Sequence, residues 1–331
     1  MNLLEQQASN RRRTVVVVGL FVSFFVLLGV GFDLFILGSR DAYVPLGALL
    51  ALGVGSASAA AGYFGGDKAV LASAGAIPIL SAVEAASEQD RLTLRQLQNV
   101  VDEMAIASGL PRPHVYVVPD ADPNAFATGR DPAHASIAVT RGLLDTLSRD
   151  QLQGVIAHEM SHVRNYDIRL MTVMAALVGA IVLLADWSRR MMWFGGGRGG
   201  RVGRRSRDGG GRGAAMAVVL VVWLVAIILA PLLAQLLAMA VSRQREYLAD
   251  ASGAELSRNP GALADALQRI EDHAEPTQSV KRGAAHLCIA DPLGRRVGLK
   301  EGFWSDLFAT HPPMVKRIAA LRRMAYQPLK P

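Results

Sequence analysis

The chain has 331 residues, of which 51% are hydrophobic, and it carries a formal net charge of +7. This length allows more than one domain, and a mean hydropathy of +0.26 lies above the range usual for soluble proteins. A single cysteine, Cys288, excludes an internal disulfide framework and fits a reducing compartment. In a membrane protein, excess positive charge is more typical of topology signals or lipid-headgroup contacts than of nucleic-acid binding.

Two apolar segments near the N-terminus predict a transmembrane hairpin over residues 14–64. A basic N-terminus, 1–13, ends in three arginines, and the apolar run 14–37 that follows has the length of a membrane-spanning helix. This run is longer than the apolar core of a typical signal peptide. The second segment, about 42–64, is rich in Gly, Ala and Ser, as at close helix–helix contacts in lipid.

Residues 65–167 predict the first part of a small α+β domain. Apolar residues at helical spacing favour a helix over 92–108, which Gly109 and Pro111 would end. Alternating and β-branched runs predict strands at 114–118, 125–129 and 136–140.

The stretch 154–162 carries the strongest chemical signal. A capping box of Ser148 and Gln151 predicts the start of a helix. On that helix, His158 and His162 lie four residues apart on one face, with Glu159 beside them, in the H-E-x-x-H pattern of zinc metallopeptidases. Neutral imidazoles suit Zn²⁺, and Glu159 would take a proton from a water at the metal. The alternative is that both histidines lie on a helix surface without a metal.

The middle of the chain predicts a second membrane hairpin. An apolar segment at 168–187 is short for a full span, whereas the segment 214–240 is long enough. Between them, 188–213 is a Gly/Arg-rich loop with too few apolar residues to pack. The loop is either a contact with lipid headgroups or another polyanion, or a solvated linker.

Residues 241–331 predict a second part of the catalytic domain. Glu246 and Asp250 are four residues apart on an expected helix. A carboxylate downstream of an H-E-x-x-H helix is what a third zinc ligand requires, and Asp250 could accept a hydrogen bond from a ligand imidazole. Taken alone, Glu246 would be an ordinary acidic residue on a helix surface.

Four motifs in order resemble the HtpX-like membrane zinc metalloproteases, gluzincins related to the CAAX prenyl proteases. The motifs are P-N-A-F-A-T-G at 123–129, H-E-x-x-H at 158–162, S-R-x-R-E-Y-x-A-D at 242–250 and T-H-P-P-x-x-x-R-I at 310–318. The resemblance covers nearly the whole chain. It implies an α-helical membrane protein with an α+β zincin-like catalytic domain and about four transmembrane or membrane-associated helices.

The resemblance also implies a role for each motif residue. One Zn²⁺ per chain would be bound by His158, His162 and Glu246. Glu159 would be the general base and then the proton donor to the leaving amine, and Asp250 would orient His158.

Two further roles come from the same resemblance. Asn124 would lie near an edge strand that aligns the substrate backbone, and His311 would stabilise the oxyanion. From the residues alone, Asn124 is a turn residue after a proline, and His311 is a helix-entry residue before Pro312.

The family further implies a multi-pass protein of the bacterial inner membrane. The histidine pair precedes the apolar segment 168–187, and Glu246 follows the segment 214–240. Because these residues must meet at one metal, the two segments must form a hairpin, which puts the catalytic parts on the same side as the N-terminal arginines. The positive-inside rule makes that side cytoplasmic. A full second hairpin would then put the Arg-rich loop outside, against the same rule, so a re-entrant hairpin is the alternative.

The expected function is a membrane-bound zinc endopeptidase that removes damaged or misfolded membrane proteins under stress, with polypeptide substrates and membrane lipids as partners. The alternative is a metal-stabilised membrane scaffold without peptidase activity. Nucleic-acid binding is disfavoured, because the basic loop lacks interleaved aromatic residues for base stacking.

Overall fold

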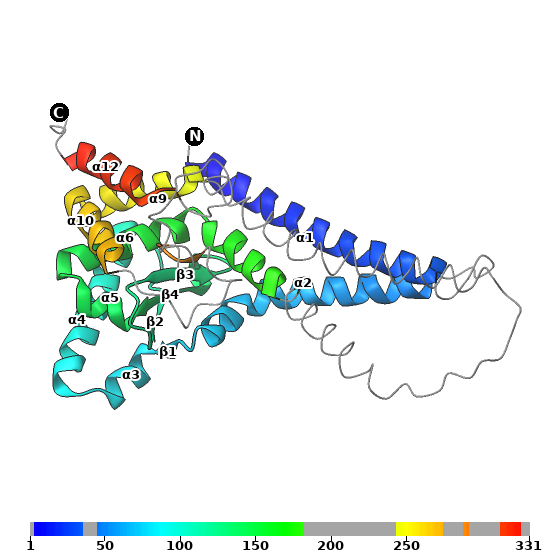
Figure 1. The fold of residues 1–331 in the computed structure, drawn as a ribbon, viewed down its shortest axis with the longest axis horizontal. Coiled ribbons are helices and arrows are strands. Elements are labelled where there is room, and N and C mark those ends of the chain that lie inside the picture. The colour runs from blue at the N-terminus through cyan, green and yellow to red at the C-terminus, as the bar shows by residue number, and fades with distance from the viewer. Residues whose placement is uncertain are drawn as a thin grey trace, which may run out of the picture. The chain divides into compact units, whose positions relative to one another are not determined.

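A computed structural model describes residues 3–35, 45–179, 181, 243–273, 287–290 and 312–325 (Figure 1). The chain forms two compact units. An α+β unit comprises Met1–Thr14, Tyr63–Ala176 and Ala238–Pro331, and a helical unit comprises Val15–Gly62 and Leu177–Leu237. The predicted loop 188–213, the predicted segment 214–240 and His311 lie outside the described residues.

Within the described residues, two helices are long and apolar enough to cross a membrane, over Glu5–Gly31 and Leu46–Ser73. The first belongs to α1, Leu3–Phe35, which already includes the basic residues expected as a separate N-terminal segment. The second is α2, Leu46–Ser73, which ends nine residues later than the predicted boundary at 64. The predicted third segment is helical over 167–179.

The hairpin of the helical unit is fixed where α1 and α2 approach each other. A Cβ on Gly29 would collide with the backbone of Gly47, so the helices are in backbone contact there. The carboxylate of Asp33 accepts the N–H groups of Gly47 and Ala48 at 2.6 and 2.8 Å. The first N–H groups of a helix have no partner within it, so this buried acid of α1 caps the start of α2.

The α+β unit is built on a mixed four-stranded sheet of order β1-β2-β4-β3. Strand β2, His114–Val118, runs parallel to β4, Ala135–Thr140, which pairs antiparallel with β3, Ala125–Gly129. These three strands confirm the predicted ones. The two-residue strand β1, Ile77–Pro78, was not predicted. Among the described strands β3 lies at the edge, and its Phe126 forms a bridge to Cys288.

Helices surround this sheet, and α6 lies at the centre of the unit (Figure 1). The predicted capping box of Ser148 and Gln151 is present at the start of α6. The helix expected at 92–108 begins earlier, at Glu88, because Ser87 caps it. The helices are α3, Ile79–Ala85; α4, Glu88–Ser108; α5, Arg141–Thr146; α6, Arg149–Arg164; α9, Arg243–Ser257; α10, Pro260–Asp272; and α12, Met314–Ala325, with a 3₁₀ turn at Pro132–His134.

Two glycines let the neighbouring helices approach α6 closely. A Cβ on Gly154 would lie 3.0 Å from the Leu263 Cα of α10. A Cβ on Gly253 of α9 would lie 2.9 Å from both the backbone nitrogen and the Cα of His158. A Cβ atom is rarely found this close to another backbone, so α9 can approach α6 beside His158 only because residue 253 is glycine. This contact brings the acids of α9 to the histidines of α6.

Candidate metal centre

The H-E-x-x-H segment lies in the buried part of α6. His158, Glu159 and His162 are 0%, 1% and 4% exposed, so all three side chains point into the unit rather than into solvent. Burial of polar groups costs free energy unless they find partners. The surface reading of the two histidines is therefore wrong.

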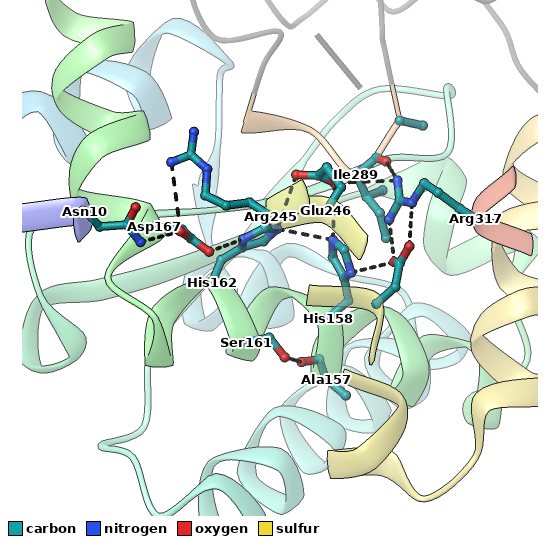
Figure 2. Close-up of polar contacts among 12 residues, drawn as sticks. Asn10, Ala157, His158, Ser161, His162, Asp167, Arg245, Glu246, Ile289 and Arg317 are labelled. Atoms are coloured by element: carbon teal, nitrogen blue, oxygen red, sulfur yellow. Dashed lines mark hydrogen bonds and ion pairs between the residues drawn. The ribbon is translucent and has the colours of Figure 1, made fainter. Parts of the chain in front are cut away.

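Glu246 of α9 faces the two imidazoles, as Figure 2 shows. The Nε2 atoms of His158 and His162 are 3.2 Å apart. The Glu246 carboxylate oxygens lie 3.8 Å from His158 Nε2 and 3.7 Å from His162 Nε2. One ligand atom from each residue can be chosen so that all three lie within 4.8 Å of one another. The structure thus brings together the three residues predicted as metal ligands.

Each imidazole is held from behind by a carboxylate. His158 Nδ1 lies 3.0 Å from the Asp250 Oδ1. His162 Nδ1 lies 3.0 Å from the Asp167 Oδ2 (Figure 2). A proton on each Nδ1 leaves the two Nε2 lone pairs pointing at one spot, where they repel unless a cation or a proton lies between them.

This donor set fits zinc. With Zn–N bonds of about 2.0–2.1 Å and tetrahedral angles, two ligand nitrogens would be about 3.3 Å apart. The 3.2 Å between the two Nε2 atoms is close to that separation. Two imidazoles and one carboxylate are also the ligands of catalytic zinc sites that keep a fourth position open.

Burial and neighbouring charges shift the pKa values of the groups around the site. Burial lowers the pKa of His158, and Asp250 offsets this only in part. Burial also disfavours the charged form of His162, but Asp167 and Glu246 outweigh it and raise its pKa to about 9. A metal would therefore displace a proton from this pair on binding.

Glu159 differs from the other acids of the site. Burial raises its pKa to about 7 against the opposing effects of His162 and the Ala127 N–H, and neither carboxylate oxygen makes a hydrogen bond of good geometry with the described residues. A carboxyl group with this pKa can accept and return a proton near neutral pH.

Arg317 of α12 is a central residue to which the sequence assigned no role. Its side chain is 0% exposed and donates to both Asp250 oxygens, at 2.8 and 2.7 Å. It also donates to the Ile289 carbonyl at 2.7 Å and lies 3.6 Å from the Glu246 carboxylate. Against the cost of burial, Arg317 holds the pKa of Asp250 at about 2. The position of Arg317 in the H-P-P-x-x-x-R-I motif was the only feature of the sequence that could have indicated a role for it.

Asn124 lies directly before the edge strand β3 and is fully buried. Its side-chain amide donates to the Ala290 carbonyl at 3.0 Å and accepts from the Ala125 N–H at 3.0 Å. The Ile289 N–H donates to the Ala125 carbonyl at 2.9 Å. Asn124 therefore joins residues 287–290 to the start of β3.

Comparison with known proteins places this site in a family. Residues 91–325 match Peptidase family M48. Proteins named Protease HtpX homolog are similar over nearly the whole chain: that of Thermoanaerobacter pseudethanolicus is 41% identical over 322 residues, covering 97% of this chain and 98% of the relative. That of Lactiplantibacillus plantarum is 41% identical over 324 residues, covering 97% and 100%. Among solved structures, Ste24p of S. mikatae aligns with a TM-score of 0.47 at 16% identity, over 96% of this chain and 67% of that one.

The matched segment contains both site helices, α6 and α9, together with Arg317. Fold, site and relatives define a membrane metallopeptidase class with an H-E-x-x-H helix. The chain belongs to Peptidase family M48, among the HtpX-like proteases.

Proposed function

We propose that this chain is a membrane-bound, zinc-dependent endopeptidase. The observation that carries the proposal is the convergence of His158, His162 and Glu246 beside a buried Glu159 whose oxygens make no hydrogen bond of good geometry with the described residues. A structural metal site needs no free carboxylate at its side, whereas hydrolysis of a peptide bond needs a base.

One zinc ion per chain would be held by His158, His162 and Glu246, with Asp250 orienting His158. When bound, zinc supplies the positive charge that lowers the pKa of a water and polarises the scissile carbonyl. The carboxylates behind the two imidazoles keep the Nδ1 protons in place, so both rings present Nε2 to the ion.

Glu159 would accept a proton from the attacking water and deliver it to the leaving amine. Its raised pKa of about 7 suits both steps, since a group that must take and return one proton works best near the ambient pH. Its burial supports the same role, because a dry environment strengthens its interaction with a developing charge.

Two residues would handle the substrate. Strand β3 could pair with an extended polypeptide through the outward-facing backbone groups that Ile289 and Thr172 do not already occupy, and Asn124 would fix the start of that strand. His311, three residues before α12 begins, would donate to the oxyanion. For Asn124 the support is its position beside the edge strand, and for His311 it is the H-P-P motif.

We place the protein in the bacterial inner membrane, multi-pass, with the active site facing the cytoplasm. Three arginines directly before the apolar part of α1 support this orientation through the positive-inside rule. Its substrates would be damaged or misfolded membrane proteins that accumulate under stress.

The test is proteolysis of an unfolded model protein by the purified full-length chain in detergent with Zn²⁺. Wild type, Glu159→Gln and the exposed control Glu255→Gln are compared, with zinc content measured in each. We expect cleavage by wild type and the control, and at least 100-fold slower cleavage by Glu159→Gln at equal zinc content. Zinc bound in all three with no cleavage by any would favour a metal-stabilised scaffold.

A further inference from the structure

The first turns of α1 contact the turn that follows the H-E-x-x-H helix. This turn, residues 164–167, joins α6 to the helix at 167–179. Within it, Tyr166 has a φ of +58°, a left-handed conformation that a bulky aromatic residue rarely adopts. Such a conformation is strained and persists only where surrounding contacts hold it.

Three residues of α1 supply those contacts. Gln7 donates its side-chain amide to the Arg164 carbonyl at 2.8 Å. Asn10 donates to the Asn165 carbonyl at 2.9 Å. The Arg11 guanidinium lies 4.7 Å from the centre of the Tyr166 ring, within the range of cation–π attraction.

The second donor of Asn10 reaches the site itself. Its amide lies 2.6 Å from the Asp167 Oδ1, and the other oxygen of that carboxylate lies 3.0 Å from His162 Nδ1 (Figure 2). Asn10 and Asp167 are 2% and 0% exposed, so water does not compete for these bonds. An unbroken chain of hydrogen bonds therefore runs from α1 through Asp167 to one of the imidazoles.

We propose that Asn10 is a positioning residue for the metal centre, which acts through Asp167 on His162. The proposal rests on His162 being a metal ligand, as in the proposed function. A carboxylate behind a ligand imidazole fixes the ring and its tautomer. Asn10 holds that carboxylate by a direct hydrogen bond of 2.6 Å, whereas the buried Arg245 lies 3.9 Å from the same oxygen. Because α1 continues into an apolar span, the first membrane helix carries a part of the metal site.

The test uses three variants of the full-length protein in detergent. Asn10→Leu keeps the volume of the side chain but removes both donors. Asp167→Asn changes the next group in the chain of hydrogen bonds. Gln7→Met is the matched control, because Gln7 anchors the same helix to the same turn without contacting Asp167. Zinc affinity is measured by chelator competition, and the visible absorption of the Co²⁺-substituted protein reports the ligand geometry.

Loss of an outer partner of a ligand imidazole typically lowers metal affinity about 10–100-fold, so we expect such a loss for Asp167→Asn and about tenfold for Asn10→Leu. Gln7→Met should stay within twofold of wild type and keep its Co²⁺ spectrum. In the Asp167→Asn background, Asn10→Leu should add little, since the two act in series.

An unchanged affinity and spectrum for Asn10→Leu would overturn the proposal, and so would an equal loss for Gln7→Met, which would mean that the helix only docks. If Asn10→Leu does not fold, Asn10→Ala removes the same donors, and the same outcomes apply. These readouts do not use peptidase activity. If the protein binds zinc but is not a peptidase, the role of Asn10 can be confirmed while the peptidase proposal fails. If the protein is a peptidase but Asn10→Leu leaves zinc affinity unchanged, only the role of Asn10 fails.

Discussion

The two histidines of the metal centre are held by different means. Behind His158 lies Asp250, and both oxygens of Asp250 accept hydrogen bonds from the buried Arg317 of α12. His162 is backed by Asp167, which receives the amide of Asn10 from the first helix and lies 3.9 Å from the buried guanidinium of Arg245. The first support is a close ion pair in which Arg317 bonds both oxygens of Asp250, while the second combines an amide from the N-terminal part of the chain with a longer ion pair to Arg245 of α9.

The two imidazoles also differ in pKa. Burial lowers the pKa of His158, and Asp250 offsets this only in part, while the Arg317 guanidinium adds positive charge nearby. Beside Asp167, the pKa of His162 is raised to about 9. One imidazole is therefore a ready ligand at neutral pH, and the other is the one that must release a proton to a metal.

The largest effect is expected from Arg317→Met, which removes the charged support. It leaves the buried carboxylates of Asp250 and Glu246 without their shared cation. Removing one partner of a buried ion pair costs about 3–5 kcal/mol, so the free energy of unfolding should fall by that amount. Denaturant unfolding measures it. Arg322→Met is the control, since Arg322 is half exposed in a 4.0 Å pair and should change stability by about 0.5 kcal/mol or less.

Neither support forms a hydrogen bond to Glu159, which burial leaves with a raised pKa, and the substitution of Glu159 tests that contrast. In the metal-free protein its pKa is about 7 when folded and near 4.5 when unfolded. The folded state binds the proton more tightly, so wild type loses stability as pH rises from about 4.5 through 7, by about 3 kcal/mol in all. Glu159→Gln does not titrate and should be more stable than wild type at pH 8 but not below pH 4.5.

The measurement is the thermal midpoint of both metal-free proteins at pH 4 and pH 8. A difference between the two midpoints that is the same at both pH values would contradict the unpartnered, buried state of Glu159.

A smaller effect is expected where α9 meets α6. Gly253→Ala would put a Cβ 2.9 Å from the His158 backbone and push α9, with Glu246, away from the imidazoles. Overpacking of this kind costs about 1–3 kcal/mol. Zinc affinity should fall with stability. Gly261→Ala is the control, because its Cβ would meet nothing nearer than 3.7 Å, and it should keep both properties. Equal behaviour of the two variants would remove the role given to Gly253.

The sequence predicted those parts of the site that depend on local spacing. His158 and His162 follow from a four-residue repeat on a capped helix, and Glu246 follows from the need for a third ligand. The three main strands follow from their apolar patterns.

The hydrogen bonds that Asn10 and Arg317 make behind the two histidines could not be predicted in the same way. Asn10 lies 157 residues from Asp167, and Arg317 lies 67 residues from Asp250. No local pattern links such pairs. The polar residues Gln6 and Asn10 are buried, although the sequence predicted residues 1–13 as a separate basic segment and not as the start of a long helix.

The most direct test of this account separates the two glutamates that face the site. Zinc content and peptidase rate are measured for Glu246→Gln and Glu159→Gln in the purified full-length protein. We expect Glu246→Gln to lose both zinc and turnover, and Glu159→Gln to keep one zinc per chain and lose turnover. Zinc retained by Glu246→Gln at wild-type affinity, or wild-type turnover in Glu159→Gln, would contradict this expectation.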